Sequence, residues 1–169
     1  VIMQLIQEGK IALDDHMSEY LGKYEWFSRI ANAHSITIRH LMQHSSGIIR
    51  YEFKEAFLTK LAEDPKKIWQ PEELLFYVLD DTAPFEAGNG FSYSDTNYVL
   101  LGMIIEKVTG NTFYNEAEKR VLNPLQIESF TPTNTLTVPN MAQGYYQEGT
   151  EYALGFKSPF LVNGAAQNN

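Results

Sequence analysis

The segment 91–110 constrains the fold of this chain more than any other stretch of the sequence. It predicts a helix over 96–109, which follows a polar loop and ends where Gly110 can take the left-handed backbone conformation that closes many helices. Four apolar side chains recur there at helical spacing, so we expect this helix to be the most deeply buried of the molecule. The apolar stripe consists of Tyr98, Leu101, Ile105 and Val108.

Three polar residues, Tyr93, Ser94 and Asp95, stand immediately before this helix. Ser94 or Asp95 can cap the helix by accepting a hydrogen bond from a free N–H group of its first turn. A phenol held beside a polar cap at the start of a rigid helix is well placed for acid–base chemistry. The alternative is an ordinary loop tyrosine that packs its ring against a capped core helix.

The rest of the pattern predicts a mainly α fold, with helix over roughly half of the chain against a usual third. Thr37 and Thr112 are expected to cap their helices, and a proline begins another. Beyond Ser129 the helical period fades, and 131–139 and 144–155 are typical of loops with short strands. The further helices are expected over 1–7, 16–21, 37–44, 53–61, 71–79 and 113–121.

Composition excludes several classes of function. The 169 residues carry a net charge of −8, which argues against a nucleic-acid surface and against a polybasic membrane-surface segment. No apolar run reaches the about 18 residues that a membrane-spanning helix needs. The chain has no cysteine, which rules out disulfides, thiolate metal sites and a cysteine nucleophile.

Several blocks of the sequence together resemble the serine β-lactamase-like family, which includes class C β-lactamases, D-alanyl-D-alanine carboxypeptidases, penicillin-binding proteins and related esterases. The resemblance implies the helical subdomain of a β-lactamase/transpeptidase-like fold, so that residues 1–169 form one partial domain. It also implies acyl transfer on a peptide, β-lactam or ester substrate, and a periplasmic, secreted or cell-envelope location. The blocks, in family order, are 2–15, 36–48, 84–91, 93–95 and 141–145.

Within this resemblance, Tyr93 and Asp95 are the catalytic candidates. The family's tyrosine takes part in proton transfer around the nucleophile and the leaving group. A phenol has a pKa near 10, so this work needs a nearby cation, which the resemblance assigns to the lysine of the first motif. Asp95 replaces the family's asparagine. An ionised aspartate only accepts hydrogen bonds, so the replacement favours a peptidase, an esterase or a non-catalytic relative over a β-lactamase.

Two family motifs are absent from the sequence. No serine is followed by lysine three positions later, and no Lys-Thr-Gly triplet occurs. We therefore interpret the chain as the middle of a longer serine hydrolase and expect the chain alone to be inactive. The alternative is a non-catalytic binding or structural module on the same scaffold. The residues that precede Val1 would discriminate between the two.

The remaining expectations concern cofactors and partners. His40 and His44 have the spacing of a zincin helix, but Leu41 stands where the general-base glutamate belongs, so neither a metal nor an organic cofactor is implied. We expect 44–47 to end a helix and brace the following loop. A second chain or a missing α/β domain is expected to cover the apolar face near residues 1–6.

Overall fold

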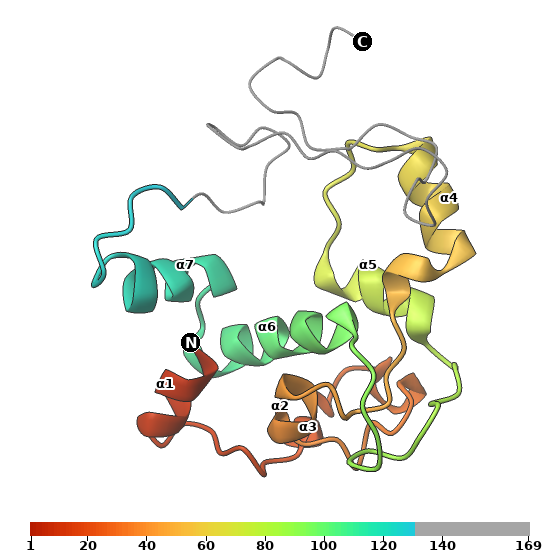
Figure 1. Cartoon of the computed structure of the whole chain (residues 1–169), viewed down its shortest axis with the longest axis horizontal. Helices are drawn as coiled ribbons and strands as arrows, with labels where there is room; N and C mark the ends of the chain where they lie inside the picture. Colours follow the sequence, from red (N-terminus) through yellow and green to blue (C-terminus); the bar gives the residue numbers. More distant parts are fainter. Residues whose placement is uncertain (131–169) are drawn as a thin grey trace, which may run out of the picture.

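The computed structural model describes residues 1–130 of the chain, and helices of all types make up 49% of that part. The long helix α6, Asp95–Thr109, crosses the middle of the molecule, and α2, α3, α5 and α7 pack against it (Figure 1). The other α-helices are α1 Ile2–Gln7, α2 Met17–Leu21, α3 Ile38–Met42, α4 Glu55–Glu63, α5 Pro71–Leu75 and α7 Phe113–Ala117. Short 3₁₀ and π turns connect them: η1 Phe27–Arg29, η2 Tyr51–Phe53, η3 Phe76–Val78 and η4 Glu118–Leu122.

This architecture confirms the predicted mainly α fold and the helical subdomain. Within residues 1–130 the β pairing is limited to an isolated antiparallel bridge between His16 and Thr37. The short strands expected over 131–139 and 144–155 lie outside the described residues. Among the helices of residues 1–130, none combines the length and the apolar character needed to cross a bilayer.

Helix α6 is the centre of the core, as the sequence predicted. More of its residues are buried than in any other helix of the described part, and Gly110 ends it at a left-handed φ of 71°. The expected stripe needs a correction, because Tyr98 is 56% exposed and Val108 is only half-buried. The face of α6 that enters the core is rotated away from Tyr98 and Val108, because α2 and α3 pack against a different side of the helix from the one that the apolar stripe predicted. Its buried residues are Thr96, Asn97, Leu100, Leu101, Met103, Ile104 and Ile105.

The predicted helix boundaries hold to within a few residues, and the exceptions have local causes. The hydroxyls of Thr37 and Thr112 cap α3 and α7 as expected, each accepting from a backbone N–H three residues later. Helix α3 ends at Met42 and not at residue 44, because His44 takes a left-handed φ of 57° that no α-helix permits.

The two ends of the described chain are joined by an ionic cluster. Arg120 of η4 pairs with Glu116 of α7 and with Glu8 just after α1. Its backbone carbonyl also accepts a 3.0 Å hydrogen bond from the Gln4 side chain. Glu116 is 2% exposed, and burying its charge requires the Arg120 partner. This cluster fixes α1 against α7 and η4.

Candidate active site around Tyr93

Two loops that lie far apart in the sequence meet at the start of α6. The loop 44–47 follows α3, and the loop 91–94 leads into α6. The Ser92 N–H donates to the carbonyl of His44 at 3.0 Å, and the Ser94 N–H donates to Nδ1 of His44 at 3.2 Å. The loop after α3 therefore holds the backbone on both sides of Tyr93, a segment distant in sequence and not the directly following loop that the sequence predicted.

Tyr93 presents its phenol at the surface of this junction. The residue is 48% exposed, and its hydroxyl donates a 2.6 Å hydrogen bond to Oδ1 of Asp95. Its ring lies 4.5 Å from the imidazole of His44, measured between ring centroids. The structure therefore brings the two predicted catalytic residues together at an exposed position.

A cation also lies at the Tyr93 ring, and sequence reasoning missed it. The guanidinium of Arg50 is 5.2 Å from the ring centroid, and its NH2 group is 3.7 Å from Oδ2 of Asp95. Arg50 acts to lower the pKa of Tyr93, but the hydrogen bond to Asp95 and the charge of that carboxylate outweigh it. The pKa of Tyr93 is therefore raised above its usual value. Tyr93 is a protonated donor here and not a phenolate.

A second carboxyl, that of Glu52 in η2, completes the charged part of the site. Burial, followed by its interaction with Asp95, raises the pKa of Glu52. The hydrogen bond from Glu52, then that from Tyr93 and the charge of Arg50, lower the pKa of Asp95. Oε2 of Glu52 is buried and has no hydrogen-bond donor within residues 1–130. The other oxygen, Oε1, accepts a 2.5 Å hydrogen bond from Nε of Arg50, so Arg50 lies close to the carboxylates of both Glu52 and Asp95.

Neither Arg50 nor Glu52 could be identified from the sequence as a site residue. Both stand in the stretch that follows the loop 44–47, where isolated charges are usually solvated. Burial of the adjacent Tyr51 raises that residue's pKa to about 12, with smaller contributions from Glu52 and Asp95. The signal that could have identified them is the alternation of charge and aromatic ring in Arg-Tyr-Glu at 50–52.

The expected side-chain cap of α6 is wrong. Ser94 occupies the N-cap position, but neither it nor Asp95 accepts a hydrogen bond from the first turn of the helix. The Ser94 hydroxyl donates instead to the carbonyl of Ile49 at 3.1 Å, beside the Thr96 hydroxyl at 2.9 Å from the same oxygen. Asp95 is the first helical residue, and its carboxylate accepts from Tyr93. A negative charge at this position still favours the helix N-terminus.

Three serines near Tyr93, namely Ser45, Ser46 and Ser94, are unsuited to act as nucleophiles. Ser46 and Ser94 are buried, and their hydroxyls donate to Asn97 and Ile49. The Ser45 hydroxyl accepts from the Gln43 amide at 3.0 Å. An attacking serine needs an adjacent base and an open approach, and these three are committed to structural bonds.

His40 and His44 have different hydrogen-bond partners in the structure. Nδ1 of His40 accepts from the Thr37 N–H at 3.3 Å, as part of the N-terminal cap of α3. His44 bonds to the loop before α6. In residues 1–130, no group of three or more His, Cys, Asp or Glu side chains is placed to hold a metal ion.

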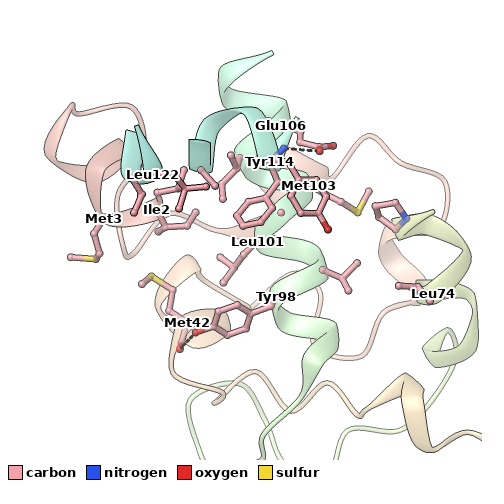
Figure 2. A pocket seen from close by; sticks show the side chains of 18 of the residues that line it. Ile2, Met3, Met42, Leu74, Tyr98, Leu101, Met103, Glu106, Tyr114 and Leu122 are labelled. Atoms are coloured by element: carbon pink, nitrogen blue, oxygen red, sulfur yellow. Dashed lines mark hydrogen bonds between the residues drawn. The ribbon is translucent and has the colours of Figure 1, made fainter. Parts of the chain in front are cut away.

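An open apolar cavity of about 720 Å³ lies beside α6, and residues of that helix line part of it. Figure 2 shows Ile2, Met3 and Leu122 on one side of it and Tyr98 and Leu101 of α6 on another. The hydroxyl of Tyr98 donates to the Met42 carbonyl at 3.5 Å. The predicted stripe thus borders this cavity through Tyr98, Leu101 and Ile105, and α6 is apolar on two faces.

The fold and the tyrosine site define a serine β-lactamase-type domain, and the chain belongs to the Beta-lactamase family, whose model matches residues 1–155. The chain is similar to "Protein flp" of Staphylococcus aureus (strain MW2), with 29% identity over 151 residues, which cover 88% of this chain and 29% of that protein. It is also similar to "Teichoic acid D-alanine hydrolase" of Staphylococcus aureus, with 27% identity over 76% of this chain and 28% of the relative.

The described helices also match solved structures. The D-stereospecific amidohydrolase from Streptomyces sp. has a TM-score of 0.68 and 34% identity, over 76% of this chain and 39% of that one. The chain therefore spans less than a third of the curated relatives named above and about two fifths of this structural relative.

Proposed function

We propose that this chain is the helical part of a serine hydrolase that acts by acyl transfer, with Tyr93 as the residue that moves protons beside the nucleophile. The observation that carries the proposal is the exposed Tyr93 hydroxyl, held at 2.6 Å on Asp95 in the family's tyrosine motif. The attacking serine, its lysine and the donors of the oxyanion hole belong to parts of the protein outside this chain.

The hydrogen bond of Tyr93 supports a relay and not a free phenolate. Because Tyr93 donates to Asp95, the lone pairs of its oxygen are available to accept a proton from a serine hydroxyl. As the serine proton reaches Tyr93, the proton of Tyr93 can pass to Asp95, so that no isolated phenolate forms. Asp95 can return that proton along the same path to the leaving group when the acyl bond breaks.

For the substrate, we propose a peptide, amide or ester of a D-amino acid in preference to a β-lactam. Two relatives are named as a teichoic acid D-alanine hydrolase and a D-stereospecific amidohydrolase. An ionised Asp95 cannot donate to the substrate carbonyl that an asparagine would contact. It can accept from an amide or ammonium group, which an aminoacyl substrate offers.

We further propose that the remainder of the β-lactamase-family domain packs over the apolar cavity beside α1. The cavity is wide and apolar, and Met3 at its rim is 57% exposed. The relatives have the additional length that such a domain requires. A hydrophobic fluorescent dye should bind the 169-residue chain at this face, and a longer form should release it. Equal dye binding by both forms would contradict this packing.

The proposed reaction is tested by covalent labelling. The 169-residue chain should form no adduct with a fluorescent penicillin or a fluorophosphonate, because every serine here lacks the partnered lysine. A longer form that includes the upstream segment should be acylated and should hydrolyse a D-alanyl ester. Failure of the folded longer form to react with the fluorophosphonate or the ester would instead support a non-catalytic module. An adduct on the short chain, mapped by mass to Ser45, Ser46 or Ser94, would identify a nucleophile inside it.

A further inference from the structure

We infer that His44 is the positioning residue of Tyr93: its neutral imidazole, through ring contacts and through Nδ1 as an acceptor, sets the place of the phenol. The inference rests on the proposed function for its consequence in catalysis, but not for its geometry. His44 does not share the hydrogen bond between Tyr93 and Asp95, so it acts through Tyr93 and not on a substrate.

The imidazole contacts two tyrosine rings. Its centroid lies 4.5 Å from that of Tyr93 at an interplanar angle of 39°, and 5.2 Å from that of Tyr98 at 25°. Phe91 adds an edge contact at 6.3 Å. Tyr98 projects from α6, so the contacts of His44 connect Tyr93 to a rigid helix.

The backbone of His44 is constrained to make these contacts. Its φ of 57° lies in the left-handed region, which is uncommon for a residue with a side chain. Strained backbone of this kind persists where the surrounding structure fixes it, and it clusters at functional sites. The conformation directs the His44 carbonyl to the Ser92 N–H and its ring to the tyrosines.

The hydrogen bonds define the protonation of the ring. Nδ1 lies 3.2 Å from the Ser94 N–H and 3.2 Å from Nδ2 of Asn97. The Asn97 amide faces His44 with its NH₂ group, because its Oδ1 accepts from the Ser46 hydroxyl at 2.6 Å. Two donors thus meet Nδ1, so the ring is neutral and carries its proton on Nε2.

The hydrogen bond between His44 and the backbone of Ser94 affects the adjacent residue Tyr93. Ser94 lies between Tyr93 and Asp95, and anchoring its N–H sets the relative position of the phenol and the carboxylate. A loss of this anchor would move the hydroxyl of Tyr93 relative to its partners. Misplacement of a reacting group by about 1 Å can lower a rate by about 100-fold.

Two variants separate the ring from the acceptor. His44→Asn keeps an acceptor oxygen near the position of Nδ1 and tolerates a positive φ, but it removes the ring. His44→Phe keeps a ring and removes the acceptor. His34→Asn is the matched control, because His34 is exposed and its contacts are with Ser28 and Phe27, outside the group around His44.

The geometric test uses the 169-residue chain and needs no activity. Nitrogen-15 NMR of the His44 ring at neutral pH should show a protonated Nε2 and an unprotonated Nδ1. Hydrogen exchange of the Ser94 amide should be faster in His44→Phe than in wild type and should stay slow in His44→Asn. A proton on Nδ1 would overturn the inference even if His44→Phe failed to fold.

The catalytic test uses the longer, hydrolase-competent form. His44→Asn should lower kcat by about 10- to 100-fold with little change in KM, whereas His34→Asn should not. In a Tyr93→Phe background, His44→Asn should cause little further loss, because both changes act on the same phenol. Equal losses in both backgrounds would overturn the inference. A wild-type form that folds but turns over no substrate would refute the proposed function, and the NMR result would still decide the role of His44.

Discussion

The Ser46 hydroxyl donates a 2.6 Å hydrogen bond to the side-chain oxygen of Asn97, although the two residues lie 51 positions apart in the chain. Both side chains are buried, and the Ser46 oxygen also accepts from the Ile48 N–H at 3.1 Å. This bond ties the loop after α3 to the first turn of α6, and it orients the amide that faces His44.

Ser46→Ala should therefore destabilise the chain by about 1–3 kcal/mol, because it leaves two buried polar groups without their partner. Denaturant unfolding measures the loss. Ser28→Ala, at an exposed position, is the control and should stay within about 0.5 kcal/mol of wild type. Equal stability of the two variants would show that the Ser46–Asn97 bond contributes little.

Gly47→Ala should be more destabilising than Gly102→Ala. A Cβ atom at Gly47 would lie 2.4 Å from the Phe85 carbonyl oxygen, at a left-handed φ of 77°. At Gly102, in the middle of α6, a Cβ atom would meet nothing within 4 Å. We expect Gly102→Ala to raise the unfolding free energy of the 169-residue chain by about 0.5–1 kcal/mol and Gly47→Ala to lower it by more than that. Thermal unfolding of the two variants gives the comparison, and the reverse order would contradict the packing at Gly47.

Asp95→Asn should lower the pKa of Tyr93 relative to wild type. The ionised carboxylate disfavours a second negative charge on the phenol, and an amide in its place removes that charge while the Arg50 cation stays. A pH titration of tyrosine absorbance, with Tyr93→Phe subtracted, isolates the residue. A Tyr93 pKa that stays the same or rises in Asp95→Asn would rule out Asp95 as the cause.

Tyr93→Phe should lower turnover of the longer, hydrolase-competent form by about 100-fold or more, the range of lost general acid–base assistance. The fold should be unaffected, because the lost hydroxyl is exposed and its partner Asp95 retains contact with Arg50. Steady-state kinetics with a D-alanyl ester and a D-Ala-D-Ala peptide provide the measurement. Tyr98→Phe is the matched control, and unchanged turnover in Tyr93→Phe would return Tyr93 to a packing role.

Glu8 should make stability depend on pH in the acid range. Hydrogen bonds from Arg120 and Lys10 lower the pKa of Glu8 from 4.5 to about 2 in the folded chain. Because the folded pKa lies below the unfolded one, the stabilisation is complete above about pH 4.5 and is lost as the pH falls towards 2. Glu8→Gln should be less stable than wild type at neutral pH, and the gap should close in acid.

Urea unfolding of wild type and Glu8→Gln from neutral to acid pH measures this gap. Glu25→Gln, at an exposed position, controls for the loss of one negative charge. A gap that stays constant with pH, or that widens in acid, would contradict the role of the Arg120 pair.

The positions of the helices could be predicted from the sequence more accurately than the contacts between them. Apolar spacing and Gly110 defined α6, and Thr37 and Thr112 marked two caps, because these are local rules. The face that α6 buries depends on where α2 and α3 pack, so the exposure of Tyr98 could not be read from spacing. The hydroxyl of Ser94 could form a hydrogen bond with the first turn of the helix or with the Ile49 carbonyl. It bonds to Ile49 because the fold places that carbonyl beside it.

For the candidate site, the sequence and the family resemblance together identified Tyr93 and Asp95, which the structure joins by a hydrogen bond. Arg50 and Glu52 were not predicted, because a charge beside a loop gives no local signal of its partner. Their importance comes from η2, which brings them to the start of α6 across more than forty residues of chain.

The Arg120 cluster has a consequence for synthesis on the ribosome. Helix α1 leaves the exit tunnel long before Arg120, because its neighbour Glu8 and its own Gln4 have this partner 112 and 116 residues later in the chain. A six-residue helix is too short to persist alone in water. Helix α1 should therefore lack its hydrogen bonds to Arg120 until that residue has emerged. A nascent chain on a ribosome stalled before the Arg120 codon should be cleaved by proteases near α1 more readily than the finished chain.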